Sequence, residues 1–366
     1  MNSIYVHIPF CPRRCSYCDF FSTTSLHKQK QYIDAVCLEL KQRQDYLLSR
    51  KIDTIYLGGG TPSTLHPDLL SKLFDTLDNL FDLSELLECT IECNPDDIQA
   101  DYLQALKNMP INRISMGVQS FNDDELKLMN RRHHAQQAID AVYQIVDAGF
   151  TNCSIDLIYG LPNQSVENWK YNLKTALSLP IKHVSAYHLT YEKTTPMYAY
   201  LNQAVSEETS CLFFELLHQY TQEAGMQAYE ISNFCMPGYE SKHNSNYWKN
   251  QPYLGIGAAA HSYNQKERCW NVASLDDYIN GIEQNKPVVE TEVLSDDDLY
   301  NELILTSLRT KEGIDTSKIH PKYRTYFTKQ CQKHLQNKTL EQNTTHTYLT
   351  PKGIFISDGI ICDLMV

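Results

Sequence analysis

Residues 1–190 alternate between short apolar runs and longer segments whose apolar residues recur at helical spacing. In one long segment, Ile139, Val142, Tyr143 and Val146 lie three or four positions apart, as they would on one face of a helix. The short runs have the length of buried strands. The predicted strands are 4–9, 54–57, 89–94, 113–119, 154–159 and 183–189, and the predicted helices are about 28–48, 67–80, 98–108, 134–148 and 165–178.

This alternation predicts an α/β fold with a parallel sheet, because right-handed helical crossovers return the chain to the same end of the sheet. A closed barrel needs eight strand–helix units, and this segment contains six. We therefore expect an open partial (β/α)6 TIM-type barrel. Functional sites in such sheets form at the carboxyl ends of the strands.

The rest of the chain departs from this regular alternation. The sequence of residues 191–285 predicts an irregular extension with a helix near 208–224 and a strand at 227–232. Residues 286–366 predict a smaller C-terminal α+β domain, winged-helix-like, with a helix near 297–308. The expected domains are thus 1–190, 191–285 and 286–366.

Composition narrows the function classes that this fold would serve. The chain has 44 acidic and 32 basic residues and a net charge of −12, which argues against general binding of nucleic acid. No stretch approaches the roughly 20 apolar residues that span a bilayer. The first residues also lack the basic and apolar regions of a signal peptide. We therefore expect a cytoplasmic protein.

The cysteines provide the strongest chemical signal in the sequence. Nine of the twelve are scattered, and in a reducing compartment we expect them to be small buried hydrophobic residues. Cys11, Cys15 and Cys18 instead form one run directly after the first strand. Three thiolates on a short loop can hold three irons of a four-iron cluster and leave the fourth iron open. A zinc site is the alternative, but it usually has four ligands, and only His7 lies nearby.

The segment from Tyr5 to Cys18, with Tyr17 between the last two cysteines, resembles the signature of radical S-adenosylmethionine (SAM) enzymes. More narrowly, it is similar to the branch that holds oxygen-independent coproporphyrinogen III oxidase and the HemW heme chaperones. The resemblance covers essentially the whole chain, including a HemN-type C-terminal domain. It implies a 4Fe-4S cluster on Cys11, Cys15 and Cys18, and SAM bound at the open iron.

Several polar residues at predicted strand ends suit a SAM pocket. The glycine run 58–60 would let the backbone approach a ligand closely, although a plain tight turn is the alternative. Glu92 and Asp156 lie on apolar strands, where a carboxylate needs a ligand or a structural partner such as Arg113 or Arg131. The resemblance implies SAM contacts for Tyr5, Tyr17, Gly59, Gly60, Thr61, Glu92, Gln119, Arg131 and Asp156.

Two departures from the oxidase pattern favour the chaperone branch. The oxidase has a fourth cysteine two residues after the third, and here that position is Phe20. The oxidase also has an N-terminal extension, whereas only ten residues precede Cys11 in this sequence. In addition, the segment from His243 to Trp248 matches the HNxxYW motif that is associated with HemW and its heme binding.

This motif suggests how heme would be held. His243 could be an axial ligand of heme iron, and Tyr247 and Trp248 could give flat apolar contact. The alternatives are an ordinary packed histidine with two aromatic neighbours, and His261 as the rival iron ligand. The implied heme-binding residues are His243, Asn244, Tyr247 and Trp248.

We therefore expect a heme chaperone that passes heme to acceptor hemoproteins such as respiratory enzymes, and that forms a cluster-linked homodimer. Delivery to respiratory enzymes would bring the protein transiently to the membrane, although the sequence shows no anchor. Two radical enzymes remain as alternatives. One would decarboxylate propionate side chains of coproporphyrinogen III, and the other would act on an unrelated small substrate.

Overall fold

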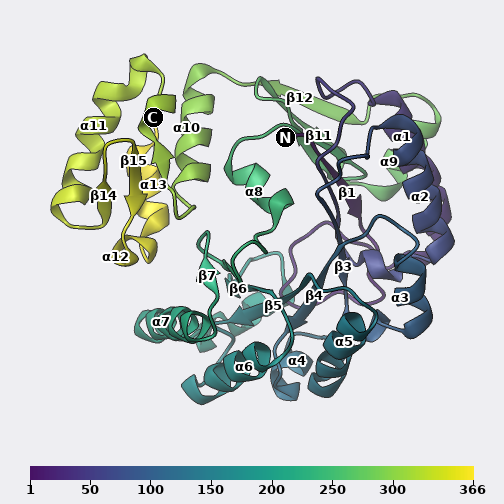
Figure 1. Ribbon diagram of the computed structural model, residues 1–366, viewed down its shortest axis with the longest axis horizontal. Helices are drawn as coiled ribbons and strands as arrows, with labels where there is room; N and C mark the ends of the chain where they lie inside the picture. Colours follow the sequence, from purple (N-terminus) through teal and green to yellow (C-terminus); the bar gives the residue numbers. More distant parts are fainter.

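The computed structural model describes residues 1–366 and contains one large curved sheet with helices along its outer side (Figure 1). Six strands lie side by side in chain order, and each pairs in parallel with the next. They are β1 (Ser3–Ile8), β2 (Thr54–Gly59), β3 (Glu88–Cys93), β4 (Arg113–Gln119), β5 (Cys153–Tyr159) and β6 (His183–His188). The predicted open barrel of six strands is therefore confirmed.

The predicted helices are present, although the first ends at Gln42 and its predicted end was residue 48. They are α1 (Gln29–Gln42), α2 (Pro67–Leu80), α3 (Ala100–Leu106), α5 (Ala135–Asp147) and α6 (Val166–Ser178). One short helix, α4 (Asp123–Leu128), was not expected. It begins where the Asn122 side chain accepts hydrogen bonds from the backbone N–H groups of Asp124 and Glu125.

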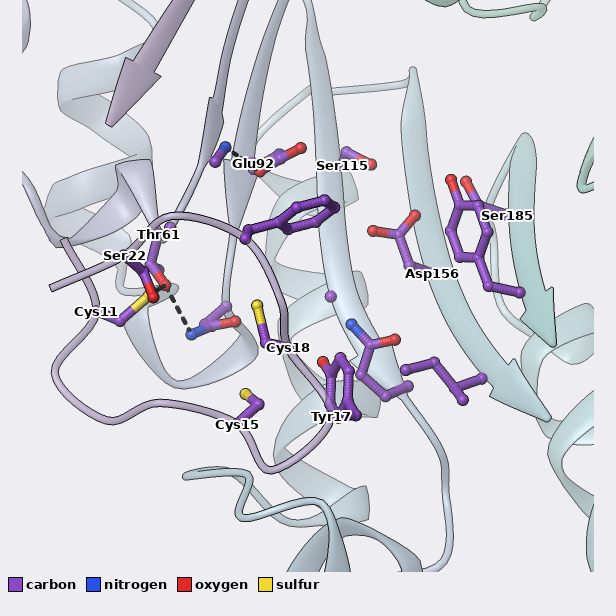
Figure 2. A pocket seen from close by; sticks show the side chains of 18 of the residues that line it. Cys11, Cys15, Tyr17, Cys18, Ser22, Thr61, Glu92, Ser115, Asp156 and Ser185 are labelled. Atoms are coloured by element: carbon purple, nitrogen blue, oxygen red, sulfur yellow. Dashed lines mark hydrogen bonds between the residues drawn. The ribbon is translucent and has the colours of Figure 1, made fainter. Parts of the chain in front are cut away.

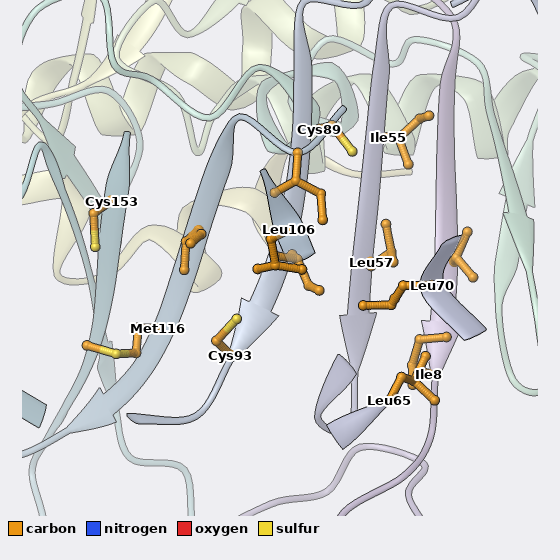
Figure 3. Close-up of a cluster of buried hydrophobic side chains, with 14 of the residues drawn as sticks. Ile8, Ile55, Leu57, Leu65, Leu70, Cys89, Cys93, Leu106, Met116 and Cys153 are labelled. Atoms are coloured by element: carbon orange, nitrogen blue, oxygen red, sulfur yellow. The ribbon is translucent and has the colours of Figure 1, made fainter. Parts of the chain in front are cut away.

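The two faces of the barrel strands have different characters. Outward residues such as Ile55, Leu57 and Met116 pack with the surrounding helices in a core of 60 buried residues (Figure 3). The predicted burial of the scattered cysteines holds for seven of the nine. Cys37, Cys89, Cys93, Cys153, Cys235, Cys269 and Cys331 are buried, Cys211 is partly exposed and Cys362 is exposed. Because side chains alternate along a strand, the inward positions form a separate, more polar surface.

Residues 191–285 are more regular than expected. Their helices are α7 (Glu207–Glu223), α8 (Lys242–Trp248) and α9 (Leu275–Glu283), and their strands are β7 (Gln227–Ala228), β8 (Asn233–Cys235), β9 (Tyr253–Ile256), β10 (His261–Tyr263) and β11 (Glu267–Asn271). These strands, with β12 (Val289–Val293), extend both edges of the large sheet. The expectation of an irregular segment was therefore wrong, because these short strands depend on pairing with distant strands. The expected strand 227–232 is also divided, since β7 ends at Ala228.

Helix α8 closes the amino-terminal end of the barrel. Glu88, the first residue of β3, accepts a hydrogen bond from the backbone N–H of His243 at 3.0 Å. Thr54, the first residue of β2, lies 2.9 Å from Nδ1 of His243. The side-chain amide of Asn246 donates to the hydroxyl of Ser3, the first residue of β1, at 2.9 Å. Three strand beginnings thus hold one short helix.

The C-terminal part has its own core of 12 buried residues and its own three-stranded sheet (Figure 1). Its elements are α10 (Asp296–Ser307), β13 (Ile314–Asp315), α11 (Pro321–Gln336), β14 (Leu340–Gln342), β15 (His346–Leu349), α12 (Pro351–Ile354) and α13 (Ser357–Leu364). Strands β14 and β15 form a hairpin, and α12 and α13 follow it. The predicted smaller C-terminal α+β domain is therefore confirmed, and its winged-helix-like character stays a prediction. None of the helices in the chain is both long and apolar enough to cross a membrane.

Candidate functional site

The cysteine loop begins where β1 ends and is fastened at its base. The backbone N–H of Cys11 donates to the carbonyl of Thr23 at 2.9 Å, and the N–H of Thr23 donates to the carbonyl of Pro9 at 2.7 Å. Cys11, Cys15 and Cys18 are free thiols that line one cavity of about 520 Å³ (Figure 2). No three His, Cys, Asp or Glu side chains are placed to hold a single metal ion. The thiols face a shared space and do not converge on one point.

One cation, Arg131, makes a direct contact with a thiol of the loop. Nη1 of Arg131 donates to Sγ of Cys15 at 3.3 Å, while Sγ of Cys11 lies 3.4 Å from the hydroxyl of Thr61. Burial raises the pKa of the Cys18 thiol to about 11 and raises the pKa of Cys11 as well. Coordination to a metal is what deprotonates thiols of this kind.

The glycine run after β2 packs tightly against the end of β1. Gly59 has a positive φ of 110°, and a Cβ there would lie 2.4 Å from the His7 ring. A Cβ on Gly60 would lie 2.7 Å from the backbone carbonyl carbon of Pro9. The glycines therefore allow two chain segments to approach each other at the cavity wall, which a simple turn would not require.

Glu92 and Asp156 are partly buried on the inner face of the barrel, and neither forms an ion pair. Glu92 accepts hydrogen bonds from the Tyr56 hydroxyl at 2.8 Å and from the Gly59 N–H at 3.0 Å. Burial raises the pKa of Glu92 to about 7 despite these donors. Burial also raises the pKa of Asp156 to about 6, although the hydroxyls of Ser185 and Ser115 lower it in part. Neither carboxyl group makes the structural ion pair that was the alternative to ligand binding.

Arg131 and Gln119 border the same cavity. Arg131 donates to Oδ1 of Asn94 at 2.7 Å and to the carbonyl of Gly117, but its Nε atom is buried without a partner. Gln119 lies at an irregularity in the pairing of β4 with β5 and has a positive φ of 72°. This backbone conformation is uncommon outside glycine.

The structure brings together eight of the nine residues predicted to bind SAM. The exception is Tyr5, which lines an adjoining cavity and places its hydroxyl 3.0 Å from Nδ1 of His7. Sequence reasoning missed other inward residues, since it did not apply the two-residue alternation of strands to polar positions. The missed residues that line the cavity include Tyr56, Ser115, Ser185 and Tyr187.

The HNxxYW segment is helical, and its histidine is completely buried. Nδ1 of His243 lies 2.9 Å from the Thr54 hydroxyl, and Nε2 lies 2.8 Å from the Tyr247 hydroxyl. Burial lowers the pKa of His243 to about 3. Asn244 lines the main cavity, whereas the indole N–H of Trp248 is buried without a partner. His243 is thus packed inside the protein, as in the alternative to a heme ligand. Heme contact by His243, Asn244, Tyr247 and Trp248 stays a prediction.

The rival histidine has a different environment. His261 is exposed at the start of β10, and its ring makes no hydrogen bond. It lines the adjoining cavity of about 300 Å³ together with Tyr247 and Tyr253.

Comparisons with known proteins agree with this architecture. The profile of the radical SAM superfamily matches residues 5–176, and that of the HemN C-terminal domain matches residues 294–356. A solved structure of Escherichia coli coproporphyrinogen III oxidase (HemN), described as a radical SAM enzyme, superimposes with a TM-score of 0.87. It covers 100% of this chain and 90% of the oxidase at 24% identity, which establishes the common fold.

Curated relatives define the family more closely. The heme chaperone HemW of Lactococcus lactis is 35% identical over 98% of this chain and 96% of its own length. The Bacillus subtilis heme chaperone HemW is 35% identical over 88% of this chain and 87% of its own. The Escherichia coli heme chaperone HemW is 36% identical over 71% and 69% of the two chains. The chain therefore belongs to the HemW family within the radical SAM superfamily.

Proposed function

We propose that this protein is a heme chaperone, which binds heme and transfers it to acceptor hemoproteins. The observation that carries the proposal is the 35% identity, along almost the whole chain, to a protein named heme chaperone HemW. Phe20 supports it, because this side chain occupies the loop position of the oxidase's fourth cysteine and is 69% exposed.

The main cavity fits the cofactors that the radical SAM family implies. Cys11, Cys15 and Cys18 would hold three irons of a 4Fe-4S cluster and leave one iron for the amino acid part of SAM. When bound and reduced, the cluster supplies an electron that can cleave SAM. Arg131 lies beside Cys15 and has a buried Nε without a partner, so its guanidinium would donate hydrogen bonds to the carboxylate of SAM.

The remaining polar groups suit the other parts of SAM. Glu92 and Asp156 would accept hydrogen bonds from its ammonium and hydroxyl groups, which their ionised forms favour. The segment Gly59 to Thr61 would place backbone groups against its amino acid part. Tyr17 would lie beside its adenine.

The proposal also covers the acceptor proteins, the location in the cell and the oligomeric state. The acceptors would be hemoproteins such as respiratory enzymes, and delivery would bring a cytoplasmic protein transiently to the membrane. A homodimer linked through the cluster would be the form in which heme is carried.

The test is an anaerobic titration of the reconstituted full-length protein with heme, followed by absorbance. A saturable Soret band with one heme per chain is expected. If no specific heme complex forms in the presence of cluster and SAM, the chaperone function is wrong.

Oxidation of coproporphyrinogen III is the second candidate, because the whole chain shares its fold with the Escherichia coli oxidase at a TM-score of 0.87. Conversion of this porphyrinogen by the reduced, SAM-loaded protein would support it. We expect no conversion under conditions in which the oxidase itself is active.

A further inference from the structure

The main cavity reaches down to the amino ends of the strands, where Arg113, Ser241 and Asn244 line its floor. The first residues of β1, β2 and β3 hold α8, whereas the first residue of β4 is Arg113, which makes no hydrogen bond to that helix. We propose that Arg113 and Asn244 bind a carboxylate of the cargo, namely a propionate group of heme. The inference rests on the proposed function, since it names residues that would hold that function's heme beside α8.

Arg113 is a buried cation with unused hydrogen-bond donors. Its residue is 2% exposed, and its Nε atom is buried without a partner. Its side chain makes one hydrogen bond, from Nη1 to Oδ1 of Asn152 at 2.8 Å. Ser115, two positions later on β4, points into the cavity, so the strand alternation directs Arg113 into it as well (Figure 2). Most of the five N–H donors of the guanidinium are therefore left for a ligand.

No carboxylate of the chain forms an ion pair with Arg113. Burial raises the pKa of Asp156 and Arg113 counteracts this in part, but the Asp156 carboxyl group has the hydroxyls of two serines as partners. Glu88, on the neighbouring strand, accepts hydrogen bonds from the backbone N–H groups in the first turn of α8. Because a buried charge without a partner is costly, the floor favours an anionic ligand.

A chain of contacts connects the surroundings of Arg113 with the start of α8. Burial and, secondly, Arg113 lower the pKa of His183 well below its usual range. Nε2 of this histidine lies 2.8 Å from the Tyr229 hydroxyl, which accepts a hydrogen bond from the backbone N–H of Ser241 at 3.3 Å. Ser241 is the N-cap of α8. The floor of the cavity therefore lies directly beside this helix.

Asn244 adds a second donor from α8 itself. Its backbone N–H donates to the hydroxyl of Ser241 at 3.3 Å, while its side-chain amide makes no hydrogen bond and lines the cavity. An amide NH₂ group and a guanidinium are both donors that a carboxylate accepts, and the guanidinium can bind its two oxygens at once. The propionate would thus be held from the barrel by Arg113 and from α8 by Asn244.

The carboxylate of SAM is already provided for at the other end of the cavity. Arg131, which we assign to it, donates to the carbonyl of Gly117 and contacts Cys15. Gly117 is four residues beyond Arg113 on β4, which places the two backbone positions roughly 13 Å apart at 3.3 Å per residue. One carboxylate cannot occupy both positions. Heme carries two propionate groups, and one of them would reach the floor while the porphyrin ring lies beside α8.

The test compares ferric heme with its dimethyl ester, in which both propionates are uncharged, by absorbance titration of the anaerobically reconstituted full-length protein. We expect the wild type to bind heme at least about tenfold more tightly than the ester. Arg113→Gln should lose this preference, with weaker binding of heme and little change for the ester. A general disturbance of the fold would weaken both ligands, so the ratio of the two affinities reports on the carboxylate contact.

Further variants sharpen the comparison. Arg113→Lys should keep part of the preference, because the positive charge remains but the two-point contact is lost. Asn244→Ala should reduce the preference by a smaller factor than Arg113→Gln. Arg50→Gln is the matched control, since it removes one positive charge from an exposed residue that pairs with Asp45. It should keep the wild-type ratio.

Three results would overturn the inference while leaving the chaperone function intact. The first is equal binding of heme and ester by the wild type, and the second is an unchanged ratio in Arg113→Gln. The third is loss of SAM affinity in Arg113→Gln, measured by equilibrium dialysis, with an unchanged heme-to-ester ratio, because Arg113 would then serve the carboxylate of SAM. If the wild type binds neither heme nor the ester, the proposed function fails first.

Discussion

At the residue scale, the inner face of the barrel holds two partly buried acidic groups, Glu92 and Asp156, that form no ion pair. Burial raises the pKa of Glu92 to about 7 and that of Asp156 to about 6. Ligand-free protein therefore holds protons on these groups well above the ordinary carboxyl range. Groups perturbed in this way often belong to binding sites, where the ligand supplies the missing partners.

Glu92 should make SAM binding depend on pH. The ionised carboxylate accepts hydrogen bonds from an ammonium or hydroxyl group, and it is lost as the pH falls through about 7. We expect SAM affinity, measured by anaerobic equilibrium dialysis, to be about tenfold weaker at pH 6 than at pH 8. Glu92→Gln should bind more weakly at pH 8 and lose this dependence. Titration of SAM itself would affect the wild type and Glu92→Gln equally. The same dependence of SAM affinity on pH in both proteins would therefore show that Glu92 does not contact SAM.

His243 should matter for stability whether or not heme is bound. Its ring is fully buried between Thr54 and Tyr247. Removing it leaves a cavity and an unpartnered Tyr247 hydroxyl, while the Thr54 hydroxyl keeps its hydrogen bond to Ser3. His243→Ala should therefore lower the free energy of unfolding by about 2–4 kcal/mol. His261→Ala should change it by less than about 0.5 kcal/mol. Equal denaturant midpoints for both variants would contradict the packed role of His243.

At the element scale, two short segments occupy opposite ends of the barrel. The cysteine loop lies at the carboxyl ends of the strands, and α8 closes the amino ends. Both depend on close contact with the first strands. The glycine run supports the loop, and Glu88 holds the first turn of α8 through hydrogen bonds to the backbone N–H groups of Lys242 and His243.

Glu88→Gln should loosen α8. One amide oxygen cannot replace two carboxylate oxygens that accept from the first helical N–H groups, and the new NH₂ group would face another donor. Hydrogen exchange measured by mass spectrometry should become faster across Lys242–Trp248. Exchange in β5 should not change. Unchanged protection of α8 would mean that Glu88 does not hold this helix.

Gly60→Ala should displace the cysteine loop. The added Cβ would lie 2.7 Å from the carbonyl carbon of Pro9, two residues before Cys11. The iron content after anaerobic reconstitution should therefore fall well below that of the wild type. Gly359→Ala is the matched control, because its Cβ would meet nothing within 4 Å. Full iron content in Gly60→Ala would show that the loop adapts.

At the scale of the whole molecule, the barrel was predictable and its edges were not. The six parallel strands were found within a few residues of their predicted bounds, because each carries a local apolar signal of adequate length. Strands β7 and β8 have only two and three residues and exist through pairing with each other and with β6. Such pairing is a long-range property that local periodicity cannot reveal.

The candidate site was likewise predictable only where it has a local sequence signal. The cysteine run and the residues of the SAM motif were identifiable from local patterns, and eight of the nine SAM residues share a cavity. The surroundings of His243 were not predictable, because Thr54 and Glu88 are more than 150 positions away in the chain. Only the folded sheet brings these strand beginnings to α8.

The central claim is that this barrel carries heme for other proteins, and heme transfer measures it most directly. The heme-loaded protein, with cluster and SAM bound, would be mixed anaerobically with an apo-hemoprotein, and the appearance of acceptor absorbance followed. We predict stoichiometric transfer, in which the acceptor takes up heme faster from this protein than from free heme. A parallel assay should show no conversion of coproporphyrinogen III. Retention of heme by the protein, or formation of protoporphyrinogen IX without any transfer, would contradict the account.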